Sequence, residues 1–346
     1  MREETGERSA RPAPMPVTVI GEAVVDLVPE PDGRYAAHPG GSPLNVAVGL
    51  ARLDVPTRLL ARFSTTALGR RLREHAAANG VDLRYAVDAA EPATLAVVSL
   101  TGDGSAGYDF YVEGTADWAW QPSELATALA RRGIVHAGSL AVFLPPGADH
   151  VGAALSAARE HGMIVSLDPN VRPGLLGAPA EARARVDHLV CRTHVVKASE
   201  EDVGWLYPGH SVEQVLDHWH DLGATLGVVT LGPHGAVARS GNQLLRQAAP
   251  ALEVVDTIGA GDAFTAGLLA VLSRASWRSA PSPGADLDAE LSGANPSWSE
   301  EEIVAALRYA VEVAGATCAR PGADPPRWQE LPGHTTDSAG QASGGT

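Results

Sequence analysis

The stretch 254–269, which reads V-V-D-T-I-G-A-G-D-A-F-T-A-G-L-L, constrains the fold more than any other part of the chain. Residues 252–255 are typical of the end of a strand, and small residues follow from Gly259 to Gly261. The apolar spacing after them predicts a helix that begins at or just before Asp262. The first N–H groups of a helix lack intrahelical partners, and glycines let an oxyanion approach them closely. The stretch therefore predicts an anion site.

Asp262 is an unusual residue in an anion site, because its carboxylate would repel a phosphate bound to the same turn. An aspartate at this position can simply cap the helix. A second interpretation explains the whole motif G-A-G-D better. The N–H groups of Ala260 and Gly261, with Gly259 before them, hold an incoming phosphoryl group while Asp262 takes the proton from a hydroxyl. We therefore predict that these four residues form a catalytic site.

Three other phosphate-binding motifs are excluded. A dinucleotide fingerprint needs a third glycine where Phe264 stands. A P-loop needs Gly-Lys-Ser/Thr, whereas Lys197 is the only lysine of the chain and follows Val196. The sequence also contains no His-Arg-Asp motif of a protein-kinase catalytic loop. The missing fingerprint also argues against a nicotinamide-dependent oxidoreductase.

Two motifs resemble the ribokinase-like (PfkB) family of carbohydrate kinases, and in particular its fructokinase-like branch. D-T-I-G-A-G-D at 256–262 is similar to the C-terminal signature of the family, and G-G-S-P-L-N-V-A-V-G-L-A-R-L at 40–53 to its N-terminal signature. The resemblance covers 16–330. It implies an α/β ribokinase-like fold in which helices flank a central, mostly parallel sheet, with a small β-sheet lid over the sugar.

The expected domain organisation follows from this resemblance and from local patterns. The kinase domain occupies 16–330, and its lid is formed from about 31–39 and 93–118. Alternation at 94–100 and 107–112 predicts a hairpin, which either pairs with 31–38 in a small separate sheet or extends an edge of the main sheet. From Pro122 onward, helical and strand patterns alternate as in a parallel sheet. The segments 1–15 and 331–346 are predicted to be a disordered leader and a disordered tail, and 17–28 one buried strand interrupted at Gly21.

Composition limits the partners of the chain. With 346 residues and 45% hydrophobic content, the chain can build one large domain. A net charge of −15 argues against nucleic acid and anionic membranes as partners, although ATP remains compatible because local N–H groups and a metal bind it. The two isolated cysteines and a charged N-terminus without an apolar core favour the cytoplasm. No apolar run reaches the length of a membrane span.

The sugar-binding residues are assigned mainly by the resemblance. Asp26 lies in an apolar strand, where a carboxylate is usually paired or functional. The resemblance implies that Asp26, the pair Gly40 and Gly41, and Asn45 contact the sugar, with Asn45 opening a helix. A capping role is the alternative for Asp26 and Asn45. D-P-N-V-R at 168–172 resembles the fructokinase and ketodeoxygluconate kinase branches and suggests Arg172 near the sugar or the phosphate, whereas a plain turn is the other interpretation.

The nucleotide-binding residues are expected beyond the next strands. Lys197 follows a short strand, and the resemblance places Ser199 near the nucleotide, with Asp202 and Glu201 as alternative residues for Mg²⁺. Acidic residues in a first helical turn need no metal to explain them. T-L-G-P-H-G resembles the nucleotide-binding turn of the family, and the resemblance also implies a monovalent cation, K⁺. The residues concerned are Thr230, Gly232 and Gly235 for the nucleotide, together with Gly261, and Asp256, Ile258 and Gly322 for the cation. The stretch 274–300 is rich in Ser, Pro, Gly, Ala and Asp, which predicts a long solvent loop near the nucleotide.

The sequence thus predicts an ATP-dependent sugar kinase that uses Mg²⁺ and acts on a small-molecule sugar. Fructose is the preferred acceptor, followed by 2-keto-3-deoxygluconate, ribose and nucleosides. The alternative of another class is a non-catalytic sugar-binding regulator, which the altered pair Ser199 and Asp202 would permit. A regulator has no use for Asp262, so the intact G-A-G-D favours the enzyme. If the chain forms a homodimer, we expect the contact to be made through the lid.

Overall fold

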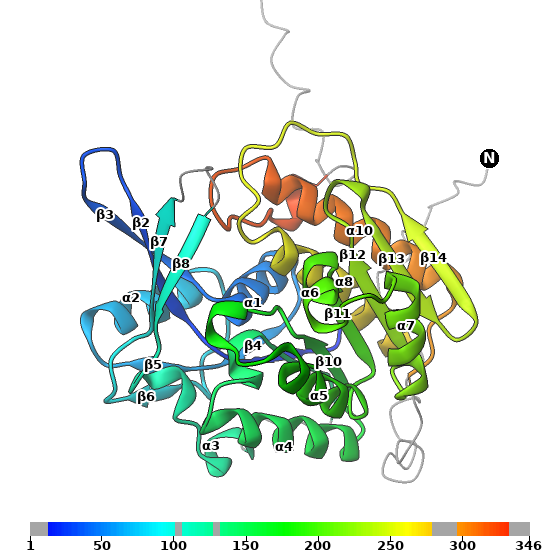
Figure 1. Ribbon diagram of the computed structural model, residues 1–346, viewed down its shortest axis with the longest axis horizontal. Helices are drawn as coiled ribbons and strands as arrows, with labels where there is room; N and C mark the ends of the chain where they lie inside the picture. Colours follow the sequence, from blue (N-terminus) through cyan, green and yellow to red (C-terminus); the bar gives the residue numbers. More distant parts are fainter. Residues whose placement is uncertain (1–12, 101–105, 127–131, 279–295, 332–346) are drawn as a thin grey trace, which may run out of the picture.

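The computed structural model describes residues 13–100, 106–126, 132–278 and 296–331 (Figure 1). Among these, the central element is an eight-stranded sheet in the order β14-β13-β12-β11-β10-β9-β1-β4. The strands from β12 to β4 are parallel, and β13 and β14 extend the sheet as an antiparallel edge. The strands are β1 (Val17–Ile20), β4 (Thr57–Leu60), β9 (Ile134–Gly138), β10 (Ile164–Asp168), β11 (Val195–Ser199), β12 (Leu226–Thr230), β13 (Ala236–Ser240) and β14 (Gln243–Gln247).

Helices cover both faces of this sheet, which explains why its strands are almost continuously apolar. Successive side chains of one strand enter opposite cores: Val195 packs into one hydrophobic cluster and Val196 into the other. The first face is covered by α1 (Ser42–Arg52), α2 (Ala67–Ala78), α8 (Ala260–Arg278) and α10 (Glu300–Cys318). The second face is covered by α3 (Pro122–Ala126), α4 (Gly147–Glu160), α5 (Pro179–Val190), α6 (Glu200–Leu206) and α7 (Val212–Asp221).

A second sheet of four strands, which we call the lid sheet, projects to one side of the core (Figure 1). Its order is β3-β2-β7-β8, from β2 (Val24–Pro29), β3 (Tyr35–Gly40), β7 (Leu95–Leu100) and β8 (Ala106–Tyr111). A separate parallel pair consists of β5 (Arg62–Ser64) and β6 (Val87–Ala89), which come between β3 and β7 in the sequence. The predicted α/β architecture, with a mostly parallel sheet, flanking helices and a smaller sheet, is confirmed.

The strand predicted over 17–28 is in fact two strands in two different sheets. β1 belongs to the core sheet and β2 to the lid sheet, and the chain turns between them at Gly21, whose φ is 155°. Asp26 therefore lies in the lid sheet and not in the core. The apolar pattern continues through the break because both strands are buried at this point, so periodicity alone could not separate them.

Four further boundaries differ from the prediction. β3 pairs with β2 and not with the hairpin of β7 and β8, because β2 lies between them in the lid sheet. The apolar pattern of the sequence had assigned β2 to the core strand. α1 begins at Ser42 rather than Asn45, since Pro43 is well suited to a first helical turn. Residues 252–255 form no strand; Val254 is 58% exposed. The loop predicted at 274–300 is helical as far as Arg278, where α8 ends.

Several predictions fall on residues outside the described ranges. The predicted leader lies outside them at 1–12, the predicted tail at 332–346, and the predicted loop at 279–295. Within the described part of the chain, no helix is both long enough and apolar enough to cross a membrane.

The topology places the ends of several strands at one edge. The chain passes from β1 to β4 on one side and later to β9 on the other, so the direction of winding changes at β1. In open α/β sheets, ligands bind beyond the carboxyl ends of strands at such a switch point. Two non-glycine residues there adopt a left-handed conformation: Ser139 after β9 (φ 53°) and Asn170 after β10 (φ 38°). Such strain is common at functional sites, so it marks this edge as the candidate site.

Candidate active site

The turn before α8 brings the predicted catalytic residues to this edge. The first helical hydrogen bond runs from the Ala263 N–H to the Gly259 carbonyl (2.8 Å), so Ala260 and Gly261 lie in the first turn. Gly259 has a φ of 75°, and a Cβ added there would lie 2.9 Å from the Cα of Ala323. Only glycine satisfies both conditions, which explains the small-residue turn in physical terms.

Asp262 joins the two sequence signatures. Its Oδ1 accepts a hydrogen bond from Ser42 Oγ (2.6 Å), and its Oδ2 accepts one from Asn45 Nδ2 (2.9 Å). The side chain is buried, and burial raises the pKa of Asp262, whereas the hydrogen bonds from Ser42 and Asn45 lower it. The two donors fix both carboxylate oxygens, so the carboxylate is held in one orientation at the start of α8. A simple helix cap would not need donors from α1, more than two hundred residues away.

Lys197 and Asp168 form a buried ion pair beside Asp262. Lys197 Nζ lies 2.8 Å from Asp168 Oδ2, and the two side chains are 5% and 1% exposed. Thr265 Oγ, one turn into α8, donates to the same oxygen (3.2 Å). Burial lowers the pKa of Lys197, but the carboxylates of Asp168, Asp202 and Asp262 together raise it above its ordinary value, so the ammonium stays charged. A Cβ on Gly261 would lie 3.3 Å from Lys197 Nζ, which places this cation directly behind the anion-site turn.

Of the predicted sugar residues, Asp26 and Gly40 lie in the lid sheet, whereas Asn45 lies in α1 and Arg172 follows β10. A Cβ on Gly40 would lie 2.0 Å from Asp26 Oδ2, so the glycine is required for the carboxylate to lie against β3. Burial raises the pKa of Asp26 to about 6; Arg172 lowers it and Asp262 raises it. Arg172 Nη1 donates to the Asn170 carbonyl (3.0 Å), which orders the D-P-N-V-R turn. The structure therefore brings Asp26, Arg172 and Asp262 to one region.

The predicted nucleotide residues lie beyond β11 and β12. Gly232 and Gly235 have φ values of 54° and 92°, and a Cβ on Gly235 would lie 1.9 Å from the Gln247 carbonyl oxygen. These glycines close the turn between β12 and β13. Thr230 Oγ lies 3.5 Å from the Ala198 carbonyl, which ties this turn to the end of β11, next to Ser199.

The two acidic candidates for a metal differ in their surroundings. Asp202 is buried; its Oδ1 accepts from the Val171 N–H (2.9 Å) and its Oδ2 from the Ser199 N–H (3.1 Å). With Ser199 it forms a capping box at the start of α6, so both of its oxygens already hold backbone groups. Glu201 is exposed. Among the described residues there is no group of three or more His, Cys, Asp and Glu arranged to hold a metal ion.

The residues predicted for a monovalent cation also come together. Asp256 Oδ1 accepts from the Ile258 N–H (3.0 Å), and its Oδ2 accepts from the Gly322 N–H (2.8 Å). Asp256 thus connects the loop before α8 to the loop after α10. The Asp256 N–H in turn donates to the Cys318 carbonyl (3.2 Å). The segment 252–256 therefore runs alongside the C-terminal end of α10 and is not paired in a sheet.

Sequence reasoning missed several residues that contact the predicted ones. Ser42 donates to Asp262, Asp168 pairs with Lys197, and Thr265 donates to Asp168. Asp168 was visible as the acidic residue that ends an apolar strand, and Ser42 as the hydroxyl inside the N-terminal signature. Thr265 lies on the face of α8 that periodicity assigns to the core, so no sequence signal could have identified it.

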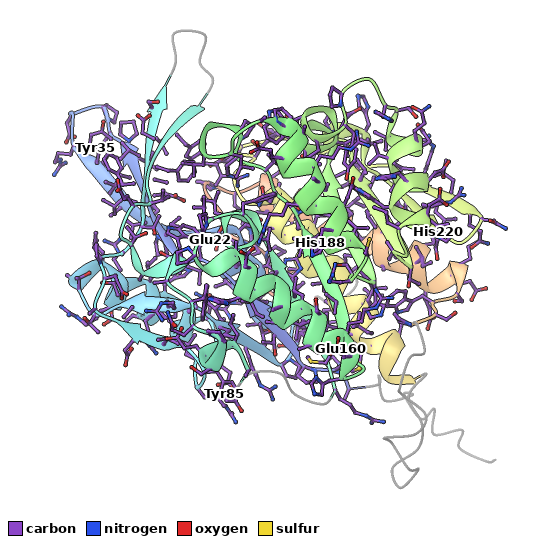
Figure 2. All side chains as sticks on the ribbon, turned by 60° about the horizontal axis from the view of Figure 1, so that its bottom comes forward. Glu22, Tyr35, Tyr85, Glu160, His188 and His220 are labelled. Carbon is purple, nitrogen blue, oxygen red and sulfur yellow. The ribbon has the colours of Figure 1, made fainter. Side chains whose placement is uncertain are left out.

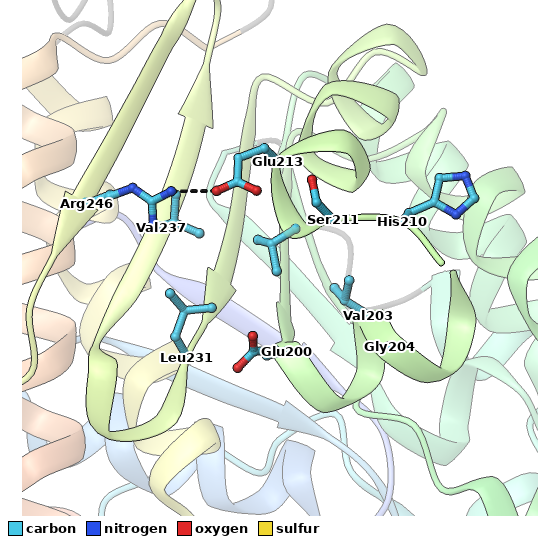
Figure 3. Close-up of a pocket in the computed structure, with 10 residues that line it drawn as sticks. Glu200, Val203, Gly204, His210, Ser211, Glu213, Leu231, Val237 and Arg246 are labelled. Atoms are coloured by element: carbon cyan, nitrogen blue, oxygen red, sulfur yellow. Dashed lines mark hydrogen bonds and ion pairs between the residues drawn. The ribbon is translucent and has the colours of Figure 1, made fainter. Parts of the chain in front are cut away.

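A pocket of about 470 Å³ lies between α6, α7 and the edge hairpin of β13 and β14 (Figure 3). The ion pair of Arg246 and Glu213 lies at one side of it, and Glu200 and Leu231 at the other. None of the residues that line it is among those predicted for sugar, nucleotide or metal. It belongs to the second face of the sheet and is separate from the cluster around Asp262, which is built on α1 and α8.

Comparison with known proteins agrees with this geometry. The model of the "pfkB family carbohydrate kinase" matches residues 16–330. The chain belongs to the PfkB family of carbohydrate kinases. A fructokinase of Klebsiella pneumoniae is 36% identical over 259 residues, which cover 74% of this chain and 84% of the relative. An aminoimidazole riboside kinase of Salmonella typhimurium is 31% identical, over 75% of this chain and 81% of the relative.

A solved structure shows the same fold. A fructokinase double mutant from Vibrio cholerae O395, with fructose, ADP and a potassium ion bound, superposes with a TM-score of 0.78 at 30% identity. The match covers 90% of this chain and 94% of that one. The predicted ribokinase-like fold and the predicted carbohydrate kinase are therefore confirmed.

Proposed function

We propose that this PfkB kinase transfers the γ-phosphoryl group of ATP to a hydroxyl of fructose. The observation that carries the proposal is the buried Asp262 carboxylate, held by Ser42 and Asn45 at the start of α8 and backed by the Lys197–Asp168 pair. This arrangement offers a fixed proton acceptor next to backbone donors, which phosphoryl transfer requires. The fructokinases among its relatives support fructose as the acceptor.

Each candidate residue has a role in this proposal. Asp262 takes the proton from the sugar hydroxyl, and the N–H groups of Ala260 and Gly261 stabilise charge on the transferring phosphoryl group. The Ala260 N–H donates to the Thr257 carbonyl (3.2 Å) in this structure, so it would exchange that partner for the phosphoryl oxygen. The sugar is held by Asp26, Gly40, Gly41, Asn45 and Arg172. The nucleotide is held by Lys197, Ser199, Thr230, Gly232 and Gly235. Little covalent chemistry is needed, because positioning and charge stabilisation supply most of the rate.

The metal requirements fit the residues at the site. Mg²⁺ keeps several waters and is bound by one or two carboxylates and the substrate phosphates rather than by an all-protein cage. The exposed Glu201 suits such water-mediated binding better than Asp202, whose oxygens hold backbone N–H groups. Mg²⁺ would supply neutralisation of phosphate charge. We also propose that K⁺ binds at Asp256, Ile258 and Gly322, as suggested by the potassium ion in the Vibrio cholerae structure. Both oxygens of Asp256 accept backbone N–H groups, as those of Asp202 do, so backbone carbonyl oxygens would supply most of the ligands.

Other acceptors and other classes stay as alternatives to be tested. 2-Keto-3-deoxygluconate, ribose and nucleosides are acceptors of the same reaction type, and one relative is an aminoimidazole riboside kinase. A non-catalytic regulator would need sugar affinity without a proton acceptor. We further propose that the enzyme acts in the cytoplasm and that a homodimer, if formed, uses the lid sheet, where Tyr35 and Tyr111 are 54% and 61% exposed.

The substrate prediction is tested by a screen of ADP release. With Mg-ATP, fructose is expected to give a higher kcat/KM than 2-keto-3-deoxygluconate, ribose, adenosine or aminoimidazole riboside. The physical basis is differential binding of the transition state. If one of the others is preferred by more than about tenfold, or about 1.4 kcal/mol, the fructose assignment is wrong. Absence of ADP release with every acceptor would instead favour the regulator.

The Ser42 hydroxyl gives a prediction about pH. The hydrogen bond from Ser42 lowers the pKa of Asp262, and a hydrogen bond to a charged group contributes about 1.5–3 kcal/mol, so Ser42→Ala should raise that pKa. Because the base acts only when ionised, the acid limb of the kcat/KM profile should move to higher pH. Ser42→Thr keeps the hydroxyl and is the matched control. An acid limb that stays in place in Ser42→Ala would contradict this role.

A further inference from the structure

The lid sheet is connected to the core by four crossings of the chain. The first crossing, 21–23, joins β1 to β2, and the second, at Gly41, joins β3 to α1. The third, 90–94, leads from β6 into β7, and the fourth, 112–115, leads from β8 to the short 3₁₀ helix η1 (Ala116–Trp118). Any movement of the lid sheet over the sugar must occur at these crossings. Hydrogen bonds that join these crossings to one another would therefore restrict movement of the lid sheet.

Asp117, in η1, binds two of these crossings at once. The side chain is buried, with 1% of the residue exposed. Its Oδ1 accepts a hydrogen bond from the Ala23 N–H (2.9 Å), and its Oδ2 accepts one from Thr94 Oγ (2.6 Å). The first and the third crossings are thus held to the fourth by a single carboxyl group. Neither hydrogen bond is part of the backbone pairing of a helix or a sheet.

The threonines extend this network to the end of β8. Thr94 Oγ lies 2.7 Å from Thr115 Oγ, and Thr115 Oγ donates to the Val112 carbonyl (2.9 Å). Backbone hydrogen bonds run in parallel: the Ala116 N–H donates to the Pro92 carbonyl (3.0 Å), and the Val25 N–H to the Thr94 carbonyl (3.0 Å). Thr94 is fully buried, so the network is protected from competing water.

The second crossing is packed against the first. A Cβ on Gly41 would lie 2.9 Å from the Glu22 carbonyl oxygen, and Gly41 has a φ of 101°. Glu22 is itself buried, and its Oε2 accepts from the Ala141 N–H (3.2 Å) after β9. In Figure 2, Glu22 lies at the middle of the molecule, whereas Tyr35 lies at the outer end of the lid sheet. The four crossings therefore contact one another through buried residues.

We propose that Asp117 is a positioning residue: with Thr94 and Thr115 it clamps the crossings, and thereby fixes where the lid sheet presents Asp26 to the sugar. Asp26 lies in β2 only three residues after the clamped Ala23, which directly precedes that strand, so a shift at Ala23 is transmitted to the carboxylate. Gly40 of β3 lies against that carboxylate and moves with the same sheet. The inference rests on the proposed function, because it assigns the clamp to sugar binding.

The experiment compares variants that break the clamp with variants that keep it. Thr94→Val removes one hydroxyl, and Asp117→Ala removes the carboxyl group. Thr94→Ser keeps the hydroxyl. Asp117→Asn also keeps the clamp, since its amide oxygen can accept from the Ala23 N–H while its nitrogen donates to Thr94. Thr193→Val is the matched control: Thr193 is equally buried, and its hydroxyl donates to the Leu189 carbonyl (2.8 Å) in α5, away from the lid sheet.

The expected result is a rise in the KM for fructose with little change for ATP. Losing buried hydrogen bonds should raise the fructose KM about tenfold in Thr94→Val and Asp117→Ala. The KM for ATP should stay within about twofold, because the nucleotide candidates lie on core elements. Thr94→Ser, Asp117→Asn and Thr193→Val should resemble the wild type in both KM values. A fructose KM that is unchanged in Thr94→Val, or raised equally in Thr193→Val, would overturn the proposal.

A second measurement keeps the inference testable if fructose is not the substrate. Wild-type enzyme that transfers phosphate to no sugar would refute the proposed function, but hydrogen exchange at β2 reports on the clamp directly. Amide exchange at Val25 should be about tenfold faster in Thr94→Val than in the wild type, whereas exchange in β11 should be unchanged. Equal exchange at Val25 in both proteins would overturn the clamp even if the enzyme phosphorylates fructose. If Asp117→Ala does not fold, Thr94→Val alone decides the question.

Discussion

Asp262→Asn is expected to lower kcat by at least about 10³, because loss of a general base typically costs about 10²–10⁴ in rate. The structure explains why the fold should survive this change. The amide oxygen can accept from Asn45 Nδ2, and the amide nitrogen can donate to Ser42 Oγ, since a hydroxyl is both donor and acceptor. Both of these hydrogen bonds are thus replaced. What is lost is the proton acceptor, one negative charge and the longer hydrogen bond (3.5 Å) that Asn170 Nδ2 donates to Oδ1 in the wild type.

The stability of this variant can be predicted with its sign. Burial raises the pKa of Asp262 in the folded state, so the folded protein binds more protons than the unfolded chain over the range between the two pKa values. The wild type therefore loses stability as pH rises through that range. Asp262→Asn has no such titration, and its melting temperature at neutral pH should equal or exceed that of the wild type. ATP affinity should hold or increase slightly, since repulsion of the phosphates is relieved.

Measuring kcat, ATP binding and melting temperature on Asp262→Asn separates the two interpretations of the residue. An N-cap aspartate is replaced by asparagine at almost no cost, so the cap hypothesis predicts near-normal kcat. A kcat within about tenfold of the wild type would rule out Asp262 as the base. Ser42→Ala, which leaves the carboxylate in place, is the control for effects of the hydrogen-bond network alone.

The two signatures predicted the centre of the site because each encodes a local structure. Gly259 and Gly261 make a turn that few other residues allow, and Asp262 follows it directly. The resemblance placed both Asp262 and Asn45 at the sugar, but the hydrogen bond between them was not predicted from the sequence. The left-handed conformation of Asn170 was hidden as well, because D-P-N reads as an ordinary turn.

What the sequence could not give is mostly a matter of three-dimensional pairing. The chain leaves the core sheet between β1 and β2, but apolar residues continue through the break because both strands are buried. Consequently β2 was assigned to the wrong sheet, and β3 was paired with the wrong neighbour. Residues 252–255 show the opposite error. Their apolar side chains suggested a strand, yet Val254 and Val255 are exposed and the segment runs alongside the end of α10.

Lys197→Met is expected to lower the free energy of unfolding by about 3–5 kcal/mol, the cost of leaving one member of a buried ion pair without its partner. Asp168 is 1% exposed, and after the change only Thr265 Oγ and the Asn170 N–H would still donate to it. Lys197→Arg is a weaker test than Lys197→Met, because a larger guanidinium has little space at a position where the side chain is 5% exposed.

The double variant Lys197→Met/Asp168→Asn separates structure from nucleotide binding. Removing the second charge eliminates the unpaired carboxylate, so the double variant should regain most of the lost stability, as measured by urea unfolding. If Lys197 also attracts the phosphates, ATP binding should remain at least about tenfold weaker in the double variant, because a nearby positive charge is still missing. Normal ATP affinity in a stable double variant would restrict Lys197 to the ion pair. A single variant within about 1 kcal/mol of the wild type would show that the pair itself contributes little.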